Sequence, residues 1–214
     1  MHVIAIDGPA GSGKSTVARR LAERMGLDYL DTGAMYRAVA FAALRRGLDP
    51  EDLEAVARMA RQLEIVVDAD GVRVDDVDAT IEIRGPEVTR AVSAVAANPG
   101  VRTELVHRQR EWVRGRAGAV VEGRDIGTVV FPDAAFKAYL TARLDVRAGR
   151  RHREVTDMAY EAVAADMARR DTIDSGRVDG PLACSDDAVQ IDTSDRDADA
   201  IVEELLQALG EAST

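Results

Sequence analysis

The sequence predicts an α/β fold: a five-stranded parallel sheet with helices on both faces. Two observations lead to this prediction. Short apolar runs alternate along the chain with longer segments in which apolar residues recur at helical spacing. The first run, residues 3–6, ends directly in a glycine-rich segment, as is typical of a buried strand that leads into a tight loop. Strands that alternate with helices in this way pair in parallel through right-handed crossovers.

Each strand of the sheet is expected where an apolar run stands between turn residues. The run at residues 3–6 (Val-Ile-Ala-Ile) contains no polar residue, so we expect it to be buried on both faces. The other four strands are expected at residues 29–31, 119–122, 136–141 and 188–193.

Helices are expected between the strands. Val17, Leu21 and Met25 mark one face of the first helix. Pro99 separates two helices, because proline interrupts the helical hydrogen-bond ladder, and a break is expected near Thr156 within an arginine-rich helix. In chain order, helices are expected at residues 14–24, 34–46, 50–63, 87–97, from 99 to 116, 143–170 and 197–209.

Residues 64–84 (EIVVDADGVRVDDVDATIEIR) differ in pattern from the rest of the chain. Short β-branched runs alternate there with turn residues, which is typical of short strands joined by tight turns. The segment therefore predicts a small β insertion in an otherwise α/β chain.

Length and composition exclude several classes of protein. The 214 residues suffice for one sizeable domain, and the net charge of −10 disfavours binding to long nucleic acids or anionic membranes. With one cysteine the chain cannot form an internal disulfide, and no Cys/His cluster has metal-site spacing. No signal peptide and no membrane-spanning run is apparent, so we expect a cytoplasmic protein, and the acidic charge favours small-molecule substrates over nucleic acid.

The segment following the first strand matches the pattern G-x-x-x-x-G-K-[ST]. Glycines let such a loop curl so that its backbone N–H groups face phosphate oxygens, and the next helix adds its positive N-terminus. Lys14 would reach the β- and γ-phosphates, and the Ser15 hydroxyl would bind Mg²⁺. The predicted ATP-binding residues are Gly8, Pro9, Ala10, Gly11, Ser12, Gly13, Lys14, Ser15 and Thr16.

A phosphate loop does not by itself define a reaction. Neither of the two lysines, Lys14 and Lys137, lies in an N-K-x-D guanine-reading motif, and no segment resembles the LSGGQ motif of ABC ATPases. A chain of this size with arginine clusters is more typical of a small-molecule kinase. Two alternatives stay open at this point: a kinase for another small acceptor, such as UMP or shikimate, and a nucleotide-binding regulator.

Five segments together resemble one family. They are GPAGSGKST (8–16), DTGAMYR (31–37), EIRGPEVT (82–89), VVEGRDIGTVVFPDA (120–134) and RRDTIDSGR (169–177). In this order, and with the β insertion, they resemble the bacterial cytidylate (CMP) kinases over residues 3–193. The phosphate loop is widely shared, whereas GRDIGTVVFPDA and the insertion are far more specific.

The resemblance implies a single kinase domain with three parts. The core would comprise residues 1–33, 98–143 and 177–214. A monophosphate-binding lobe with the β insertion would comprise 34–97, and the lid with its flanking helices 144–176. The implied reaction transfers the γ-phosphoryl group of ATP to CMP or dCMP, with Mg²⁺ as cofactor. The resemblance also implies a monomer.

The resemblance also implies roles for individual residues in holding the acceptor. Asp125 would accept a hydrogen bond from the cytosine N4 amine. Arg37 and Arg124 would hold the CMP phosphate, because a guanidinium group matches phosphate oxygens. The other implied acceptor residues are Ser93, Arg102 and Arg177 at or near the base, and Arg170 and Asp174 at the ribose. Thr32 and Tyr36 are implied to line the part of the site that binds the monophosphate.

Catalysis in such a kinase relies on charge neutralisation rather than on a strong base, because the attacking phosphate oxygen is already anionic. The candidates are Lys14 and Arg124 with three lid arginines, Arg147, Arg150 and Arg151. Glu122, at the end of a buried strand, would orient Mg²⁺ through water. The alternative for the lid arginines is solvated surface charge, and the alternative for Arg170, Asp174 and Arg177 is a surface ion-pair ladder.

Overall fold

The computed structural model describes residues 2–68, 71–154 and 158–212. It divides the chain into two compact units: unit 1 comprises Met1–Tyr29 and Arg116–Thr214, and unit 2 comprises Leu30–Gly115. Each unit is described by itself below. No helix in the described part of the chain is long and apolar enough to cross a membrane.

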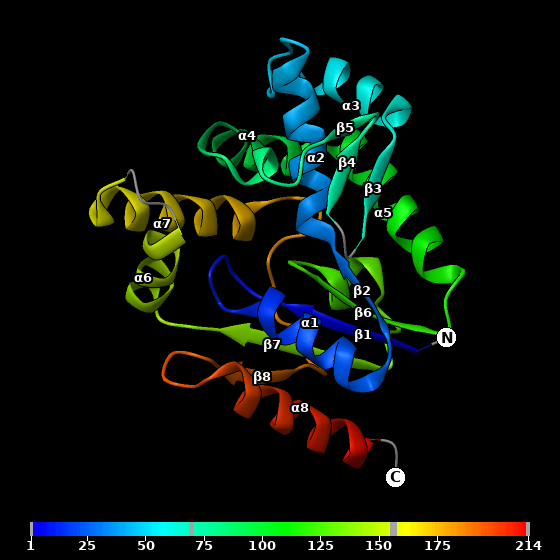
Figure 1. Cartoon of the computed structure of the whole chain (residues 1–214), viewed down its shortest axis with the longest axis vertical. Coiled ribbons are helices and arrows are strands. Elements are labelled where there is room, and N and C mark those ends of the chain that lie inside the picture. Colours follow the sequence, from blue (N-terminus) through cyan, green and yellow to red (C-terminus); the bar gives the residue numbers. More distant parts are fainter. Residues whose placement is uncertain (1, 69–70, 155–157, 213–214) are drawn as a thin grey trace. The chain divides into compact units, whose positions relative to one another are not determined.

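A five-stranded sheet has the order β2-β6-β1-β7-β8, which confirms the predicted α/β fold (Figure 1). Strand β1 lies at its centre and pairs in parallel with β6 on one side and β7 on the other, and β7 pairs in parallel with β8. The bounds of the strands are β1 His2–Asp7, β2 Asp28–Asp31, β6 Gly118–Gly123, β7 Phe136–Thr141 and β8 Val189–Asp192.

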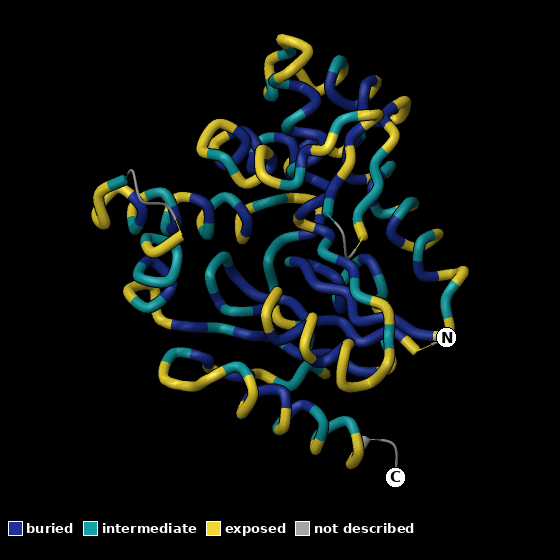
Figure 2. Tube along the Cα trace, in the orientation of Figure 1, coloured by how far each residue is buried: buried dark blue, intermediate teal, exposed yellow. Residues whose placement is uncertain are grey.

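The central strands are buried because their side chains are apolar on both faces (Figure 2). Ile4 and Ile6 of β1 join Val120 of β6 and Leu140 of β7 in one hydrophobic cluster. Helices α1 (Lys14–Met25) and α8 (Ala198–Ala212) add Leu21 and other apolar side chains to this cluster and pack against each other. This core packs around the strands, and the loops that carry the predicted site residues begin at the ends of these strands.

Two further helices follow β7 in unit 1 and pack against each other (Figure 1). They are α6 (Leu144–Glu154) and α7 (Tyr160–Gly176), so the predicted arginine-rich helix is in fact two helices. Thr156, where the break was predicted, lies outside the described residues. A single π-helical turn, η2 (Ile126–Val130), follows β6 and was not predicted from the sequence.

Unit 2 is mainly helical. Its helices are α2 (Thr32–Arg45), α3 (Leu53–Gln62), α4 (Pro86–Ala97) and α5 (Pro99–Arg114). Asn98 separates α4 from α5, and its side chain accepts hydrogen bonds from the first backbone N–H groups of α5. The predicted division of this region at Pro99 is thereby confirmed.

The β insertion forms a three-stranded antiparallel sheet of β3 (Ile65–Val67), β4 (Val72–Val74) and β5 (Val77–Asp78). The expectation that strand structure extends to residue 84 is wrong, because Glu82–Arg84 form a 3₁₀ turn, η1. The Asp78 carboxylate accepts hydrogen bonds from the backbone N–H and hydroxyl of Thr80, and this local turn ends the strand. Within η1 the apolar Ile83 is fully buried.

Candidate functional site

The phosphate loop leaves the sheet at the carboxyl end of β1. Gly8 has φ 150°, and a Cβ atom there would lie 2.0 Å from the carbonyl oxygen of Leu140, so only glycine fits. Lys14 is buried at the start of α1, and its Nζ donates to the Pro9 carbonyl at 3.0 Å. The buried Ser12 hydroxyl has no hydrogen-bond partner among the described residues, whereas Ser15 and Thr16 are exposed. The polar groups of Ser12 and Lys14 are therefore buried inside the loop, whereas Ser15 and Thr16 in the first turn of α1 face solvent.

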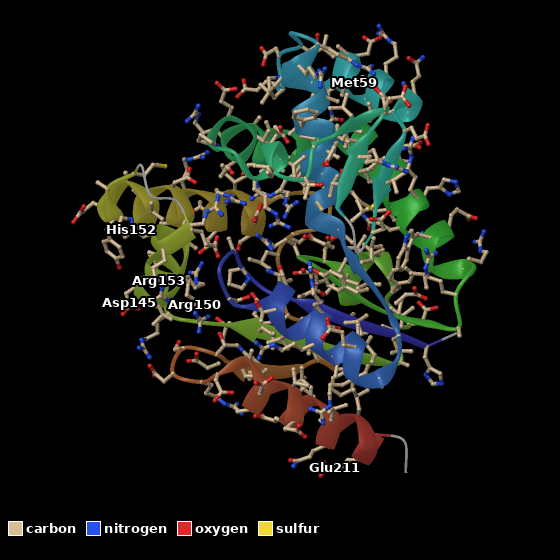
Figure 3. All side chains as sticks on the ribbon, viewed as in Figure 1. Met59, Asp145, Arg150, His152, Arg153 and Glu211 are labelled. Atoms are coloured by element: carbon tan, nitrogen blue, oxygen red, sulfur yellow. The ribbon has the colours of Figure 1, made fainter. Side chains whose placement is uncertain are left out.

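Side chains from distant parts of unit 1 donate hydrogen bonds to the backbone carbonyl groups of this loop, beginning with two arginines of α6. Arg147 Nη1 donates to the Ala10 carbonyl at 3.2 Å and pairs with Asp171 at 2.7 Å. Arg150 extends from α6 toward the loop (Figure 3), where its Nη1 donates to the Gly11 carbonyl at 3.3 Å. Two of the three predicted lid arginines are thus tied to the phosphate loop.

Thr193 is a third contact to the loop and was not predicted from the sequence. Its hydroxyl donates to the Ser12 carbonyl at 2.8 Å and accepts from Arg150 at 3.1 Å. Arg150 also donates to the Thr193 carbonyl at 2.6 Å. The only sequence signal was its position directly after the last strand of a parallel sheet, where ligands often bind. Arg151, the remaining lid arginine, pairs with Glu154 at 2.9 Å.

A second functional segment leaves the sheet beside the phosphate loop, because β6 pairs in parallel with β1 and Gly123 lies opposite Asp7. Arg124 follows immediately. Its Nη1 donates to the Gly8 carbonyl at 3.1 Å, and its Nε donates to Asp174 at 3.0 Å. The guanidinium group is thereby fixed between the phosphate loop and α7. The neighbouring Asp125 is buried.

Helix α7 contributes a buried charge cluster rather than a surface ladder. Arg170 and Asp174 are only 8% and 6% exposed. Burial opposes ionisation of Asp174, but the positive charges of Arg124, Arg177 and Arg170 prevail and lower its pKa. Burial also lowers the pKa of Arg170, and its Nε has no hydrogen-bond partner among the described residues. A buried guanidinium with an unused donor is suited to binding an oxygen-rich ligand.

Glu122, the last side chain of β6 before the second segment, is buried and accepts a hydrogen bond from the Tyr29 hydroxyl at 2.5 Å. The Arg19 guanidinium lies 5.2 Å above the Tyr29 ring. Among the described residues, no group of three or more His, Cys, Asp or Glu side chains could hold a metal ion.

The other predicted acceptor residues lie in unit 2, on three helices that pack on one another. Arg37 of α2 donates to the Ile83 carbonyl at 3.1 Å and to the Thr89 hydroxyl at 3.0 Å. Arg102 of α5 donates to the Tyr36 hydroxyl at 3.4 Å. The remaining two, Thr32 at the start of α2 and Ser93 on α4, are buried.

Comparison with known proteins identifies close relatives along the whole chain. A family model described as cytidylate kinase matches residues 4–211. The cytidylate kinase of Mycolicibacterium paratuberculosis is 51% identical over 211 residues, covering 95% of this chain and 92% of that protein. The cytidylate kinase of Caldanaerobacter subterraneus subsp. tengcongensis is 46% identical over 210 residues, covering 96% and 93%.

Solved structures show the same fold at low sequence identity. The shikimate kinase of Acinetobacter baumannii has a TM-score of 0.51 at 16% identity and covers 99% of this chain and 94% of its own. A gluconokinase from Sinorhizobium meliloti has a TM-score of 0.51 at 16% identity and covers 98% and 92%. These likenesses concern the fold alone.

Proposed function

The chain belongs to the cytidylate kinase family, and we propose that it transfers the γ-phosphoryl group of ATP to CMP or dCMP, giving ADP and CDP or dCDP. One observation supports this function above all others. Arg124, in the segment that is specific to the family, donates both to a carbonyl of the phosphate loop and to the buried Asp174. Within unit 1, Arg124 therefore connects the phosphate loop with Asp174, one of the residues proposed for the acceptor.

The phosphate loop is the proposed site of the ATP phosphates. Its glycines allow backbone N–H groups to face the phosphates, and Lys14 would move from the Pro9 carbonyl to the transferring group. The unused Ser12 hydroxyl would find its partner in a phosphate oxygen. We assign nucleotide binding to residues 8–16 on this basis.

Each unit contains residues that are proposed to bind CMP. In unit 1, Arg124 would bind the CMP phosphate, Arg170 and Asp174 the ribose, and Asp125 and Arg177 the base. The burial of Arg170 and Asp174 supports this assignment, because a buried charge cluster requires partners that solvent cannot supply. In unit 2, the residues proposed for CMP binding from the family resemblance are Thr32, Tyr36, Arg37, Ser93 and Arg102.

The reaction itself needs little from the protein beyond position and charge. The CMP phosphate oxygen is already a nucleophile, so Lys14 and the arginines would align it with the γ-phosphate and neutralise the developing charge. Arg147 and Arg150 are the lid arginines best placed for this, because both already reach the phosphate loop. Mg²⁺, when bound with ATP, supplies further positive charge at the phosphates, and Ser15 and Glu122 are the residues proposed to hold or orient it.

The test is ADP production from ATP and Mg²⁺ with CMP, dCMP, UMP, AMP, GMP and shikimate, each alone at equal concentration. We expect strong turnover with CMP and dCMP, weak turnover with UMP and none with the others. Activity confined to another acceptor would overturn the assignment of the acceptor residues. ATP binding without turnover on any acceptor would instead favour a nucleotide-binding regulator.

A further inference from the structure

Asp171 is a partly buried aspartate of α7 to which the proposed mechanism gives no role. One of its carboxylate oxygens, Oδ2, lies 2.7 Å from Nη1 of Arg147, and the side chain is 24% exposed. The other oxygen, Oδ1, is buried and has no hydrogen-bond partner among the described residues. Within the described part of the chain, Arg147 is therefore the one residue with which this carboxylate pairs.

Arg147, on α6, is buried and is held at three points. Its Nε donates to the Ala142 carbonyl at 2.9 Å, and its Nη1 donates to the Ala10 carbonyl of the phosphate loop at 3.2 Å. The third contact is the ion pair with Asp171. A guanidinium group taken out of water requires an opposite charge close by. Among these three contacts, Asp171 alone supplies one.

The other two lid arginines are held differently. Arg150 donates to two backbone carbonyls and to the Thr193 hydroxyl. Arg151 pairs with Glu154 of its own helix. Among the described residues of α6, Arg147 is therefore the one that forms an ion pair with α7.

Helix α7 holds a second arginine of the proposed site in the same way. Asp174, one helical turn after Asp171, accepts from Arg124 at 3.0 Å. Arg124 and Arg147 both donate to carbonyl groups of the phosphate loop, those of Gly8 and Ala10. Two aspartates of one helix thus hold two arginines against one loop.

We propose that Asp171 is a positioning residue for phosphoryl transfer: by pairing with Arg147 it fixes this guanidinium group beside the phosphate loop, where the γ-phosphate of ATP would bind. An arginine stabilises the developing charge best when it is already oriented before the reaction, because the transition state then requires no reorganisation of the site. Asp171 itself would touch neither substrate and would act through Arg147. This inference rests on the proposed function.

The experiment measures the rate of phosphoryl transfer in a single turnover with saturating ATP, Mg²⁺ and CMP, in the wild-type enzyme and in Asp171→Asn. A single turnover reports the transfer itself rather than product release. Asparagine keeps the shape of the side chain but removes its charge. We expect the transfer rate to fall about tenfold, as for the loss of a charge-assisted contact to an arginine.

The steady-state KM values distinguish this role from a role in binding. KM for ATP and KM for CMP should each stay within about twofold in Asp171→Asn, because the contact of Arg147 with the phosphoryl group would be strongest in the transition state. A loss of ground-state binding would instead raise KM and leave the transfer rate at saturation unchanged.

Three comparisons separate positioning from general damage. In the Arg147→Gln background, Asp171→Asn should cause no further loss of rate, because the pair is already broken. Asp166→Asn breaks a similar ion pair on the same helix, with Arg169 at 2.7 Å, and should leave the rate unchanged. Val202→Ala opens a cavity in the core of unit 1 and should lower stability without changing the transfer rate.

If Asp171→Asn does not fold, Asp171→Glu is measured in its place. Glutamate keeps the charge beside Arg147 but lengthens the side chain by one methylene group, so a severalfold lower transfer rate is expected from the displaced guanidinium group. An unchanged or faster rate in the variant measured, a further loss in the Arg147→Gln background, or an equal loss in Asp166→Asn would each overturn the inference. A wild-type enzyme inactive with CMP would instead refute the proposed function.

Discussion

The two loops that leave adjacent strands β1 and β6 are built by different means. The phosphate loop carries its chemistry mainly in its backbone, whose shape depends on its own glycines. Distant side chains such as Arg147 and Thr193 bind only carbonyl groups of this backbone. The segment after β6 carries its chemistry in side chains, and each of these is held by a residue from elsewhere in the chain. Arg124 is held by Gly8 and Asp174, and the turn after Asp125 is held by Asp7.

The difference agrees with the proposed roles, in which the phosphate loop would bind a part that all nucleoside triphosphates share and the segment after β6 would bind a particular base. Backbone N–H groups in a curled loop recognise phosphate, which is the same in every triphosphate. Choosing one base requires a specific donor and acceptor pattern, and therefore side chains at defined positions. A buried network of charges positions those side chains and is sensitive to the loss of any member.

The largest expected effect is that of Arg124→Ala. Loss of its guanidinium should lower kcat/KM for CMP about a thousandfold, as for other arginines that neutralise a transferring phosphate, while ATP binding persists because the phosphate loop keeps its glycines and Lys14. Steady-state kinetics and calorimetry with ATP measure the two quantities. Arg143→Ala is the matched control, since Arg143 is exposed and pairs with Asp195. Normal use of CMP by Arg124→Ala would show that Arg124 is not the phosphate clamp.

The next effect concerns stability and pH. The pKa of Asp7 is raised to about 6 in the folded chain, so the folded chain binds this proton more tightly than the unfolded chain. Its contribution to the free energy of unfolding is therefore greatest below pH 4 and declines as pH rises through 6, by about 2–3 kcal/mol.

The measurement for this effect is the free energy of unfolding of the wild type minus that of Asp7→Asn, followed by urea titration from pH 4 to pH 7. The difference should decrease as pH rises. A difference independent of pH would mean that the pKa of Asp7 is the same in both states. In Asp125→Asn, the pKa of Asp7 should fall, because the charge of Asp125 contributes to raising it.

A smaller effect is expected on the donor side. Thr193→Val keeps the shape of the side chain but removes the hydroxyl that binds both the Ser12 carbonyl and Arg150. KM for ATP should rise about tenfold, while KM for CMP changes little. Thr103→Val is the control, because Thr103 is exposed and its hydroxyl donates to the Pro99 carbonyl within the same helix. This change should alter neither KM for ATP nor KM for CMP. An unchanged KM for ATP would exclude Thr193 from supporting the phosphate loop.

The smallest effect is a change in base selection. Asp125→Asn offers a donor as well as an acceptor, so the preference for CMP over UMP should fall severalfold to tenfold. The ratio of kcat/KM values for the two nucleotides measures it. If that ratio were unchanged, Asp125 would not be the residue that reads the cytosine amine, and the contrast between the two loops would lose its basis.

Local patterns in the sequence predicted most of the secondary structure. The apolar runs, the G-x-x-x-x-G-K-S motif and the helix break at Pro99 each depend on neighbouring residues. The turn η2 and the 3₁₀ turn η1 were missed, because tertiary contacts outweigh weak local preference over a few residues. The roles of the predicted site residues remain proposals, as does the division into core, lobe and lid.

The sequence by itself determined the α/β class, the phosphate loop and the family, since these follow from periodicity and from motifs of contiguous residues. Only the tertiary structure showed that Asp7 caps η2, that Thr193 binds Ser12 and Arg150, and that Asp174 holds Arg124. The physical reason is that a hydrogen bond between residues far apart in the sequence, here 43 to 181 positions, leaves no periodic trace in it. Such a bond exists only when the parallel strands have placed their carboxyl ends at one edge of the sheet.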